Sequence, residues 1–292
     1  MLASEIQIRD PFIVAHDSLY YMFGSTDKDI WKAPGTGFDV YKSADLINWD
    51  APIAAFRPPE SFWGTHNFWA PEVHKYGDNF YMFATFAGAD SLRGTAILKA
   101  DHPSGSFAPW SDGAVTPRDW ACLDGTLFVD DDSNPWIVFC HEWKQIGNGT
   151  ICAARLSDDL KCCISEPIVL FSSASASWSV KISSSTKGVD GYVTDGPFLY
   201  RLQNGKLLLL WSCIGKAGYC SGYAISESGE ITGPWEQCSE PLFAGDGGHG
   251  MLFKAYDGRL LLTLHSPNKT PNERAVFIEL EETKTGLRVK QG

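Results

Sequence analysis

The sequence predicts an all-β fold, a five-bladed β-propeller of antiparallel sheets around a central axis. First, short runs of strand-forming residues bounded by Gly, Asp, Asn and Pro recur along the 292 residues, while helical periodicity is nearly absent. Second, five similar openings begin such runs, near residues 10, 70, 124, 195 and 249. Their spacing of 54 to 71 residues is that of a repeat built from one sheet per unit.

Each opening is followed by a predicted hairpin. In the first unit, residues 11–15 pair with residues 19–25, and residues 38–43 supply a third strand. Later units turn at Asn204-Gly205 and Asp257-Gly258, dipeptides that tolerate the positive φ of tight turns. We expect one domain over residues 1–292, with an outer strand supplied by the tail after Glu282 or by residues 5–8. Residues 172–190, rich in Ser and Gly, are predicted to form a surface loop at the rim of a pocket.

The charge balance limits the classes of partner that the protein is expected to bind. Lys and Arg number 24 against 35 Asp and Glu, a formal net charge of −11. Nucleic acids and anionic lipid surfaces are therefore not expected as partners, because binding them requires clustered basic residues. No apolar run approaches the roughly 18 to 20 residues needed to span a bilayer, so a membrane role is not expected. The acidic balance fits a neutral substrate better than an anionic one.

The eight cysteines show no paired CxxC spacing of a zinc or redox site. Several lie in apolar strand contexts, where a free thiol behaves as a small apolar side chain. This pattern favours a reducing compartment. The first ten residues lack the basic start and apolar stretch of a secretory signal. We therefore expect a cytoplasmic protein, or a secreted one whose signal peptide has been trimmed away.

Three aspartates stand where blades open: Asp10, Asp124 and Asp195. In a propeller these openings meet around one axis, so carboxylates far apart in sequence would share a pocket. Two carboxyl groups across a sugar ring can serve as general base and general acid, and a gap of roughly 6.5 to 9.5 Å leaves room for the water of an inverting hydrolysis. A third carboxylate would raise the pKa of the acid by repulsion between like charges.

The openings resemble those of the family 43 glycoside hydrolases, five-bladed propellers that act on polysaccharides containing arabinose and xylose. The matching stretches are Arg9-Asp10-Pro11-Phe12, Trp69-Ala70-Pro71-Glu72-Val73, the run from Leu123 to Asp132, and Gly248-His249-Gly250. The resemblance implies that Asp10 activates water as the general base. It implies that Asp124 orients the acid and tunes its pKa, and that His249 lies on the axis near a bound calcium ion.

The fourth opening departs from the family pattern. Most members have Glu-Gly-Pro with Glu as the general acid, whereas this chain has Asp195-Gly196-Pro197. The Asp side chain is about 1.5 Å shorter, the length of one C–C bond, and a misplacement of about 1 Å can cost roughly a hundredfold in rate. Three interpretations remain: Asp195 is the acid, Glu142 is the acid, or hydrolysis has been lost.

Further residues are candidates for binding substrate. Aromatic side chains at the proposed rim could stack on a sugar face, and polar ones could bond its hydroxyls; these candidates are Trp69, Phe68, Trp143, His66, Glu72 and His265. His249 is the metal candidate for a structural calcium ion, and we expect catalysis to require no cofactor.

The predicted function is a glycoside hydrolase, expected to invert, that removes arabinose or xylose units from plant-type polysaccharides or oligosaccharides. Two alternatives remain open: a carbohydrate-binding propeller without hydrolysis, and a hydrolase specific for galactosyl or galactofuranosyl units. The sequence by itself chooses neither the sugar nor endo or exo action.

Overall fold

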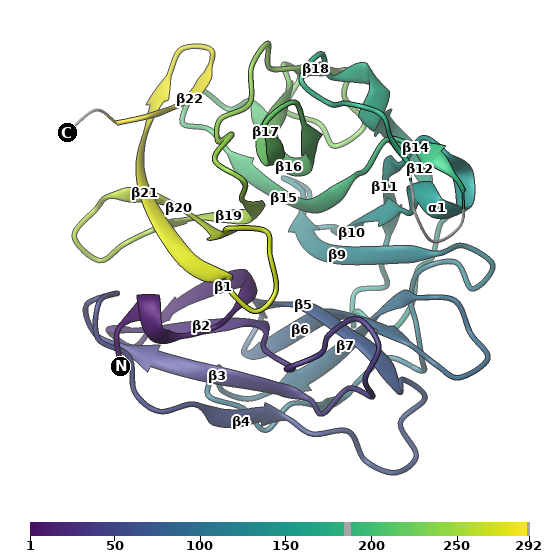
Figure 1. The fold of residues 1–292 in the computed structure, drawn as a ribbon, viewed down its shortest axis with the longest axis vertical. Coiled ribbons are helices and arrows are strands. Elements are labelled where there is room, and N and C mark those ends of the chain that lie inside the picture. The colour runs from purple at the N-terminus through teal and green to yellow at the C-terminus, as the bar shows by residue number, and fades with distance from the viewer. Residues whose placement is uncertain (184–187, 291–292) are drawn as a thin grey trace.

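Five four-stranded antiparallel sheets form a ring, which confirms the predicted five-bladed propeller (Figure 1). The structure is a computed structural model, and it describes residues 1–183 and 188–290. The innermost strands β1, β5, β9, β15 and β19 contact one another around the axis. Every blade begins with its innermost strand and proceeds outward along the chain.

The first two blades are built from the N-terminal part of the chain. Blade 1 contains β1 (Arg9–His16), β2 (Leu19–Ser25), β3 (Phe38–Ser43) and β4 (Ile53–Phe56). Blade 2 contains β5 (His66–Tyr76), β6 (Asn79–Ala87), β7 (Gly94–Ala100) and β8 (Ala108–Pro109). In both blades the predicted hairpins are present, with turns at residues 17–18 and 77–78.

The remaining blades follow the same plan. Blade 3 contains β9 (Cys122–Val129), β10 (Pro135–His141), β11 (Thr150–Arg155) and β12 (Ile168–Ser172). Blade 4 contains β15 (Asp195–Arg201), β16 (Leu207–Gly215), β17 (Gly218–Ser226) and β18 (Trp235–Gln237). Blade 5 contains β19 (Gly248–Lys254), β20 (Leu260–Ser266), β21 (Arg274–Thr283) and β22 (Gly286–Val289).

A few short elements lie between or outside the blades. They are the 3₁₀ helices η1 (Ala3–Glu5) and η2 (Ser173–Ser175), the α-helix α1 (Trp143–Ile146), and the two-stranded hairpin of β13 (Ile182–Ser183) and β14 (Asp190–Gly191). The predicted loop over residues 172–190 thus contains η2 and this hairpin, and its residues 184–187 lie outside the described chain. None of the helices in the described ranges qualifies as a membrane-spanning segment.

The ring closes where the last blade meets the first (Figure 1). The C-terminal tail supplies β22, the outer strand of blade 5, as one of the two alternatives predicted. Residues 5–8 form no strand. Instead, the backbone N–H of Ile8 donates to the carbonyl of Glu273 at 3.2 Å, and the Arg274 side chain donates to the carbonyl of Ser4. These bonds tie the N-terminal segment to β21.

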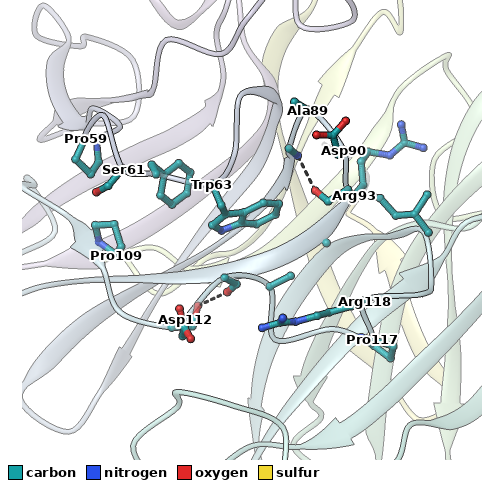
Figure 2. A pocket seen from close by; sticks show the side chains of 18 residues that line it. Pro59, Ser61, Trp63, Ala89, Asp90, Arg93, Pro109, Asp112, Pro117 and Arg118 are labelled. Atoms are coloured by element: carbon teal, nitrogen blue, oxygen red, sulfur yellow. Dashed lines mark hydrogen bonds between the residues drawn. The ribbon is translucent and has the colours of Figure 1, made fainter.

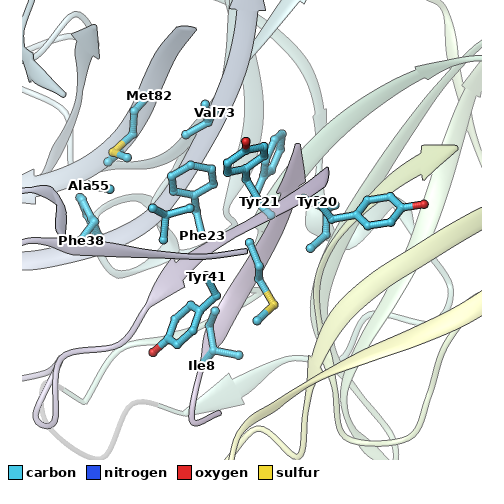
Figure 3. Packing of buried hydrophobic residues seen from close by; sticks show 14 of the residues in the cluster. Ile8, Tyr20, Tyr21, Phe23, Phe38, Tyr41, Ala55, Val73 and Met82 are labelled. Carbon is cyan, nitrogen blue, oxygen red and sulfur yellow. The ribbon is translucent and has the colours of Figure 1, made fainter. Parts of the chain in front are cut away.

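The core consists of apolar faces packed between neighbouring blades. Figure 3 shows one such cluster, in which Phe23 and Phe38 of blade 1 lie beside Val73 and Met82 of blade 2. All eight cysteines are free thiols, and most are buried in these interfaces. Because both faces of an inner strand are covered, the strands hold the blade openings rigidly around the axis.

Candidate active site

Each blade opens with a bulge at its innermost strand. At every opening one residue has a positive φ, between 47° and 57°, and the pairing with the second strand shifts in register there. The residues in this conformation are Asp10, Ala70, Asp124, Gly196 and His249. A bulge redirects side chains and interrupts strand pairing. Five bulges at the same end of the ring therefore present these positions to the axis.

A repeated hydrogen bond fixes four of the five bulges to the preceding blade. The N–H groups of Ala70, Asp124 and His249 donate to the hydroxyls of Ser25, Thr85 and Ser212, at 2.8, 2.9 and 2.9 Å. The N–H of Asp10 donates to Nδ1 of His265 at 3.1 Å. The four acceptors occupy equivalent places on the second strands of their blades. These bonds set the position of each axial residue relative to its neighbour.

Blade 4 breaks this pattern. Its bulge residue is Gly196, whose N–H donates to Oδ2 of Asp124 at 3.1 Å, and the equivalent acceptor place on blade 3 is taken by Cys140. A Cβ atom on Gly196 would lie 2.7 Å from the ring of His249, so no side chain fits there. Asp195 accordingly precedes the bulge residue by one position.

This offset corrects the expectation that the three aspartates are equivalent. Asp10, Asp124 and His249 share one structural position, whereas Asp195 corresponds to the residue before the bulge in the other blades. The sequence signature Asp-Gly-Pro looked like the other openings, but glycine takes the positive φ in this one. Asp195 therefore approaches the axis from a different direction.

The imidazole of His249 lies at the centre of the carboxylates. Its Nδ1 atom is 3.3 Å from Oδ1 of Asp10 and 3.7 Å from both Oδ2 of Asp124 and Oδ1 of Asp195. Burial lowers the pKa of His249, but the carboxylates of Asp10 and Asp124 more than offset this effect and raise it well above its ordinary value. A protonated His249 balances part of the negative charge in the pocket.

Asp10 is held as a carboxylate. Its Oδ2 accepts a hydrogen bond of 2.7 Å from the hydroxyl of Ser25. Burial raises its pKa, but His249, Arg9 and His265 lower it more, and the net shift is downward. Burial lowers the pKa of His265 to about 4, so this ring is neutral near pH 7 and its Nδ1 accepts the N–H of Asp10. Asp10 therefore stays ionised in the range where a base is needed.

Asp124 and Asp195 form a coupled pair. One oxygen of each and a nitrogen of His249 all lie within 4.8 Å of one another. Burial and the neighbouring Asp195 raise the pKa of Asp124 well above its ordinary value. Burial raises the pKa of Asp195, but Asp124 and His249 offset it and lower the pKa below its ordinary value, assisted by Tyr219, whose hydroxyl donates to Asp195 at 2.6 Å. Such a pair holds one proton between two carboxylates.

Asp195 is the more exposed member of this pair. Its side chain is 25% exposed, against 4% for Asp124. Because Oδ1 of Asp10 and Oδ1 of Asp195 lie 3.3 and 3.7 Å from the same nitrogen, they can be no farther apart than about 7 Å, the sum of those distances. An upper limit of about 7 Å allows the shortest carboxyl separations found in inverting glycosidases, and it also allows the roughly 5 to 5.5 Å found in retaining ones.

Glu142 lies at the same rim, before α1, but its carboxylate is paired with two cations. One oxygen contacts the guanidinium of Arg93, and the other lies 3.3 Å from Nζ of Lys144. Arg93 in turn stacks over the ring of Trp69, 5.1 Å from its centroid. A carboxylate between two cations is stabilised in its charged form.

These residues line a pocket of about 180 Å³ on the axis. Its walls include the four candidate catalytic carboxylates, His249, and three tryptophans: Trp31, Trp69 and Trp143. Trp69 is fixed by a hydrogen bond of 2.7 Å from its Nε1 to the carbonyl of Ile30, and Trp31 contacts it edge to face. The aromatic walls suit the apolar face of one sugar unit.

Four of the predicted substrate-binding residues do not line this pocket. Phe68 is 2% exposed and packs in the core against Phe38, Phe56, Phe62 and Phe86, so the prediction that it contacts substrate is wrong. Glu72 and His265 are buried behind His249 and Asp10 and position those residues instead. His66 bonds Thr65 at the start of β5. For Phe68, the alternation of side chains along β5 gives the reason, because it sends Phe68 and its neighbour Trp69 to opposite faces.

Sequence reasoning missed Arg9, Arg93 and Tyr219. Arg9 forms a buried ion pair of 2.9 Å with Glu273 and stacks over Trp31, a wall of the pocket. Arg9 directly precedes Asp10, which was a usable signal. Arg93 lies in the loop between β6 and β7, and Tyr219 lies in β17, the third strand of blade 4. Neither stands at a blade opening, so the sequence around them does not mark them as axial.

The donor atoms around His249 do not meet the needs of a calcium ion. Nε2 of His249 and Oε2 of Glu72 are buried atoms without a hydrogen-bond partner among the described residues, so a ligand could bridge them. Ca²⁺ takes six to eight oxygen ligands, and one nitrogen and one carboxylate fall far short of that number. Near Nδ1, the other nitrogen of the imidazole, the available donors are the candidate catalytic carboxylates themselves. The residues present do not form a calcium cage, and calcium binding stays a prediction.

Most glycoside hydrolases use a pair of carboxyl groups that flank the bond to be cleaved, and the axial pocket brings Asp10, Asp124 and Asp195 together around His249. The sequence matches the family described as Glycosyl hydrolases family 43 over residues 4–285, and the chain belongs to that family.

Similar proteins agree with this assignment. An endo-arabinase from Bacteroides thetaiotaomicron VPI-5482 is 41% identical, with a TM-score of 0.90 over 97% of this chain and 98% of that one. An endo-1,4-beta-xylanase from the same organism is 26% identical, with a TM-score of 0.78 over 98% and 95%. The extracellular endo-alpha-(1->5)-L-arabinanase 1 of Bacillus subtilis (strain 168) is 27% identical over 49% of this chain. The chain spans 46% of that relative's length.

Proposed function

We propose that this protein hydrolyses arabinosyl or xylosyl bonds in plant-type oligosaccharides or polysaccharides, and that it inverts the anomeric centre. The observation that carries the proposal is the convergence of Asp10, Asp124 and Asp195 on Nδ1 of His249. The similarity to an endo-arabinase at 41% identity favours arabinose as the sugar. The small axial pocket would hold the sugar unit whose bond is cleaved.

Asp10 is the general base of the proposal. Its lowered pKa keeps it ionised, and its bonds to Ser25 and His265 fix its orientation. Asp10 accepts a proton from water as the water oxygen attacks the anomeric carbon. Positioned proton transfer of this kind contributes roughly 10² to 10⁴ in rate.

Asp195 is the general acid of the proposal. The Asp124–Asp195 pair supplies the proton, and Asp195 delivers it to the departing glycosidic oxygen because it is the member exposed to the pocket. Asp124 stores the proton in the empty site, since its pKa is the higher of the two. Glu142 is the weaker candidate, because Arg93 and Lys144 both bind its carboxylate. Its contacts suit positioning of Arg93 over Trp69.

The net charge of −11 supports a neutral glycan partner and disfavours nucleic acid or a membrane surface. We expect a monomer, since the ring pairs its own strands and completes every blade within one chain. Cytoplasmic location, or secretion after removal of a signal peptide, stays a prediction.

The variant Asp10→Asn tests the proposal. On aryl α-L-arabinofuranosides and aryl β-D-xylosides, we expect its turnover to fall by roughly 10² to 10⁴, while its circular dichroism spectrum matches that of the parent protein. Proton NMR of the first product formed by the parent should show the anomer opposite to that of the substrate. Near-normal turnover by the variant would overturn the assignment of the base. Sugar binding by the parent without product from arabinosides, xylosides or galactosides would favour a binding propeller.

A further inference from the structure

A second and larger hollow lies on the same face of the propeller as the axial pocket. It has a volume of about 620 Å³, within the range of ligand-binding pockets. Its walls come from three connections of blade 2: the segment before β5, the loop between β6 and β7, and the segment between β8 and β9. Because β5 begins at the axial openings, these three segments meet at the rim outside the catalytic residues.

Trp63 is the central side chain of this cavity. Figure 2 shows its indole ring between Ala89 and Arg93 on one side and Asp112 and Arg118 on the other. The ring is held from behind by Phe62 and Phe86, with centroids 6.0 and 6.1 Å away. Its position is therefore set by the core, as is required of a platform for a sugar ring.

The indole N–H of Trp63 has no acceptor. Nε1 is buried, and the described chain offers it no hydrogen-bond partner. Buried donors are almost always satisfied, and one left without a partner is destabilising. A ligand hydroxyl at this place would accept the hydrogen bond.

Three charged side chains at the rim also lack partners. Asp90, Asp112 and Arg118 line the cavity, and among the described residues none of the three side chains forms an ion pair or hydrogen bond. Carboxylates accept hydrogen bonds, and the guanidinium donates up to five in a plane. Charges of both signs around an aromatic platform suit a neutral, hydroxyl-rich ligand better than an ion.

Arg93 links the cavity to the axial pocket. Arg93 lines the outer cavity, while its guanidinium pairs with Glu142 and stacks over Trp69, both of which line the axial pocket. A chain with one sugar unit on the axis would therefore pass over Arg93 before it reaches Trp63.

We propose that the cavity around Trp63 binds further sugar units of the same glycan whose scissile unit lies in the axial pocket. The inference rests on the proposed function for the identity of the glycan, an arabinose- or xylose-containing chain. Trp63 supplies the stacking face and an N–H donor, and Arg118 and Asp112 bond sugar hydroxyls. Long chains are then bound more tightly than short ones, and the protein prefers polymers to terminal disaccharides.

The test measures binding separately from hydrolysis. Calorimetric titration of the Asp10→Asn protein with arabino-oligosaccharides of two to six units should show affinity that rises with length. Adding Trp63→Ala should weaken binding of the hexasaccharide about tenfold and leave the disaccharide unchanged. Trp63→Phe keeps an aromatic face without the N–H, so its affinity for the hexasaccharide should lie between those of the Asp10→Asn protein and the Trp63→Ala variant. Arg118→Ala, at an exposed position, should weaken the hexasaccharide several-fold without disturbing the core.

Controls separate this inference from the proposed activity. Tyr256→Ala removes an exposed aromatic residue from the β19–β20 turn, at the opposite end of the blades, and should bind every oligosaccharide as the Asp10→Asn protein does. In the catalytically intact protein, Trp63→Ala should leave kcat/KM for an aryl arabinofuranoside unchanged. The inference is overturned if Trp63→Ala and Arg118→Ala bind the hexasaccharide as tightly as the parent does. It also fails if affinity is independent of length in arabino-, xylo- and galacto-oligosaccharide series. Length-dependent binding through Trp63 without hydrolysis would overturn the proposed function alone.

Discussion

The Nδ1 atom of His249 lies 3.3 Å from the Oδ1 atom of Asp10, and the two residues occupy the same structural position in neighbouring blades. Each has a positive φ, and each donates its N–H to a side chain of the blade before it. The imidazole thus takes the axial place in blade 5 that a carboxylate takes in blades 1 and 3. A cation at the centre allows several carboxylates to share a buried site, because it offsets their mutual repulsion.

Asp195→Asn should distinguish the two candidate acids. A general acid matters most when the leaving group is a poor one, so this variant should lose roughly 10² to 10⁴ in kcat on natural oligosaccharides. It should lose much less on dinitrophenyl glycosides, whose leaving group needs no proton. Glu142→Gln is the matched variant and should keep most of its activity on both. The opposite ranking, with oligosaccharide cleavage lost only in Glu142→Gln, would make Glu142 the acid.

Asp124→Asn should move the alkaline limb of the pH–rate profile to lower pH. In the parent, the acid pair stays protonated until the pH rises through the raised pKa of Asp124, and activity is lost above that pH. In the variant the proton must rest on Asp195 alone; burial raises the pKa of that group, but His249 and Tyr219 lower it. Activity should therefore decline at a lower pH. The measurement is kcat/KM as a function of pH, with the exposed Asp132→Asn as control. An alkaline limb that stays in place would contradict the shared proton.

Glu273→Ala should strongly destabilise the fold. The Glu273 side chain is fully buried, and its Oε1 accepts hydrogen bonds from Arg9 at 2.9 Å and from Thr270 at 2.6 Å. Removing one partner of a buried ion pair leaves the other charge uncompensated, which costs about 3 to 5 kcal/mol. Glu281→Ala breaks the exposed pair with Arg288 and should change the free energy of unfolding by at most about 1 kcal/mol. Urea denaturation compares the two. Equal effects would show that Arg9 finds another partner.

Chelation should leave catalysis intact. Nε2 of His249 and Glu72 provide too few donors for a tightly held Ca²⁺ ion, and the proposed proton transfers use only side chains of the protein. After dialysis against EDTA, kcat should stay within about twofold of the untreated value. Such a change corresponds to much less than the 1.4 kcal/mol that a tenfold change represents. Addition of calcium should at most raise the melting temperature. Loss of turnover that calcium restores, and magnesium does not, would show that an ion belongs to the site.

Much of the fold could be predicted because its signals are local. Strand β2 and the third strand β3 have the predicted bounds, since turn residues and strand propensity mark them within a few positions. Asp10 and Asp124 were placed on the axis from their blade openings, and the structure puts both there. Trp69 was placed at the pocket rim because it adjoins a blade opening, and Trp143 because it follows the end of the strand antiparallel to the one that starts at Asp124; both line the pocket.

The predictions that failed concern positions where a shift of one residue along a strand changes the direction of the side chain. Phe68 and Trp69 are adjacent, yet one packs in the core and the other lines the pocket, because strand side chains alternate between faces. Asp195 matched the other openings in sequence, but Gly196 took the bulge because the ring of His249 leaves no room for a Cβ atom there. His249 is 53 residues after Gly196, so no local pattern could report this contact.

The sequence by itself determined a ring of five sheets, each beginning with a hairpin, and the position of aspartates at its axis. These features could be predicted because periodicity, turn residues and motif spacing are signals carried by short stretches of chain. The tertiary structure decided which carboxylates lie close enough to couple, that Arg93 and Lys144 bind Glu142, and that Trp63 lines a cavity beside the axial pocket. These relationships depend on distances between blades. Such distances are set by packing and by single-residue register at the bulges, which no individual segment of the sequence encodes.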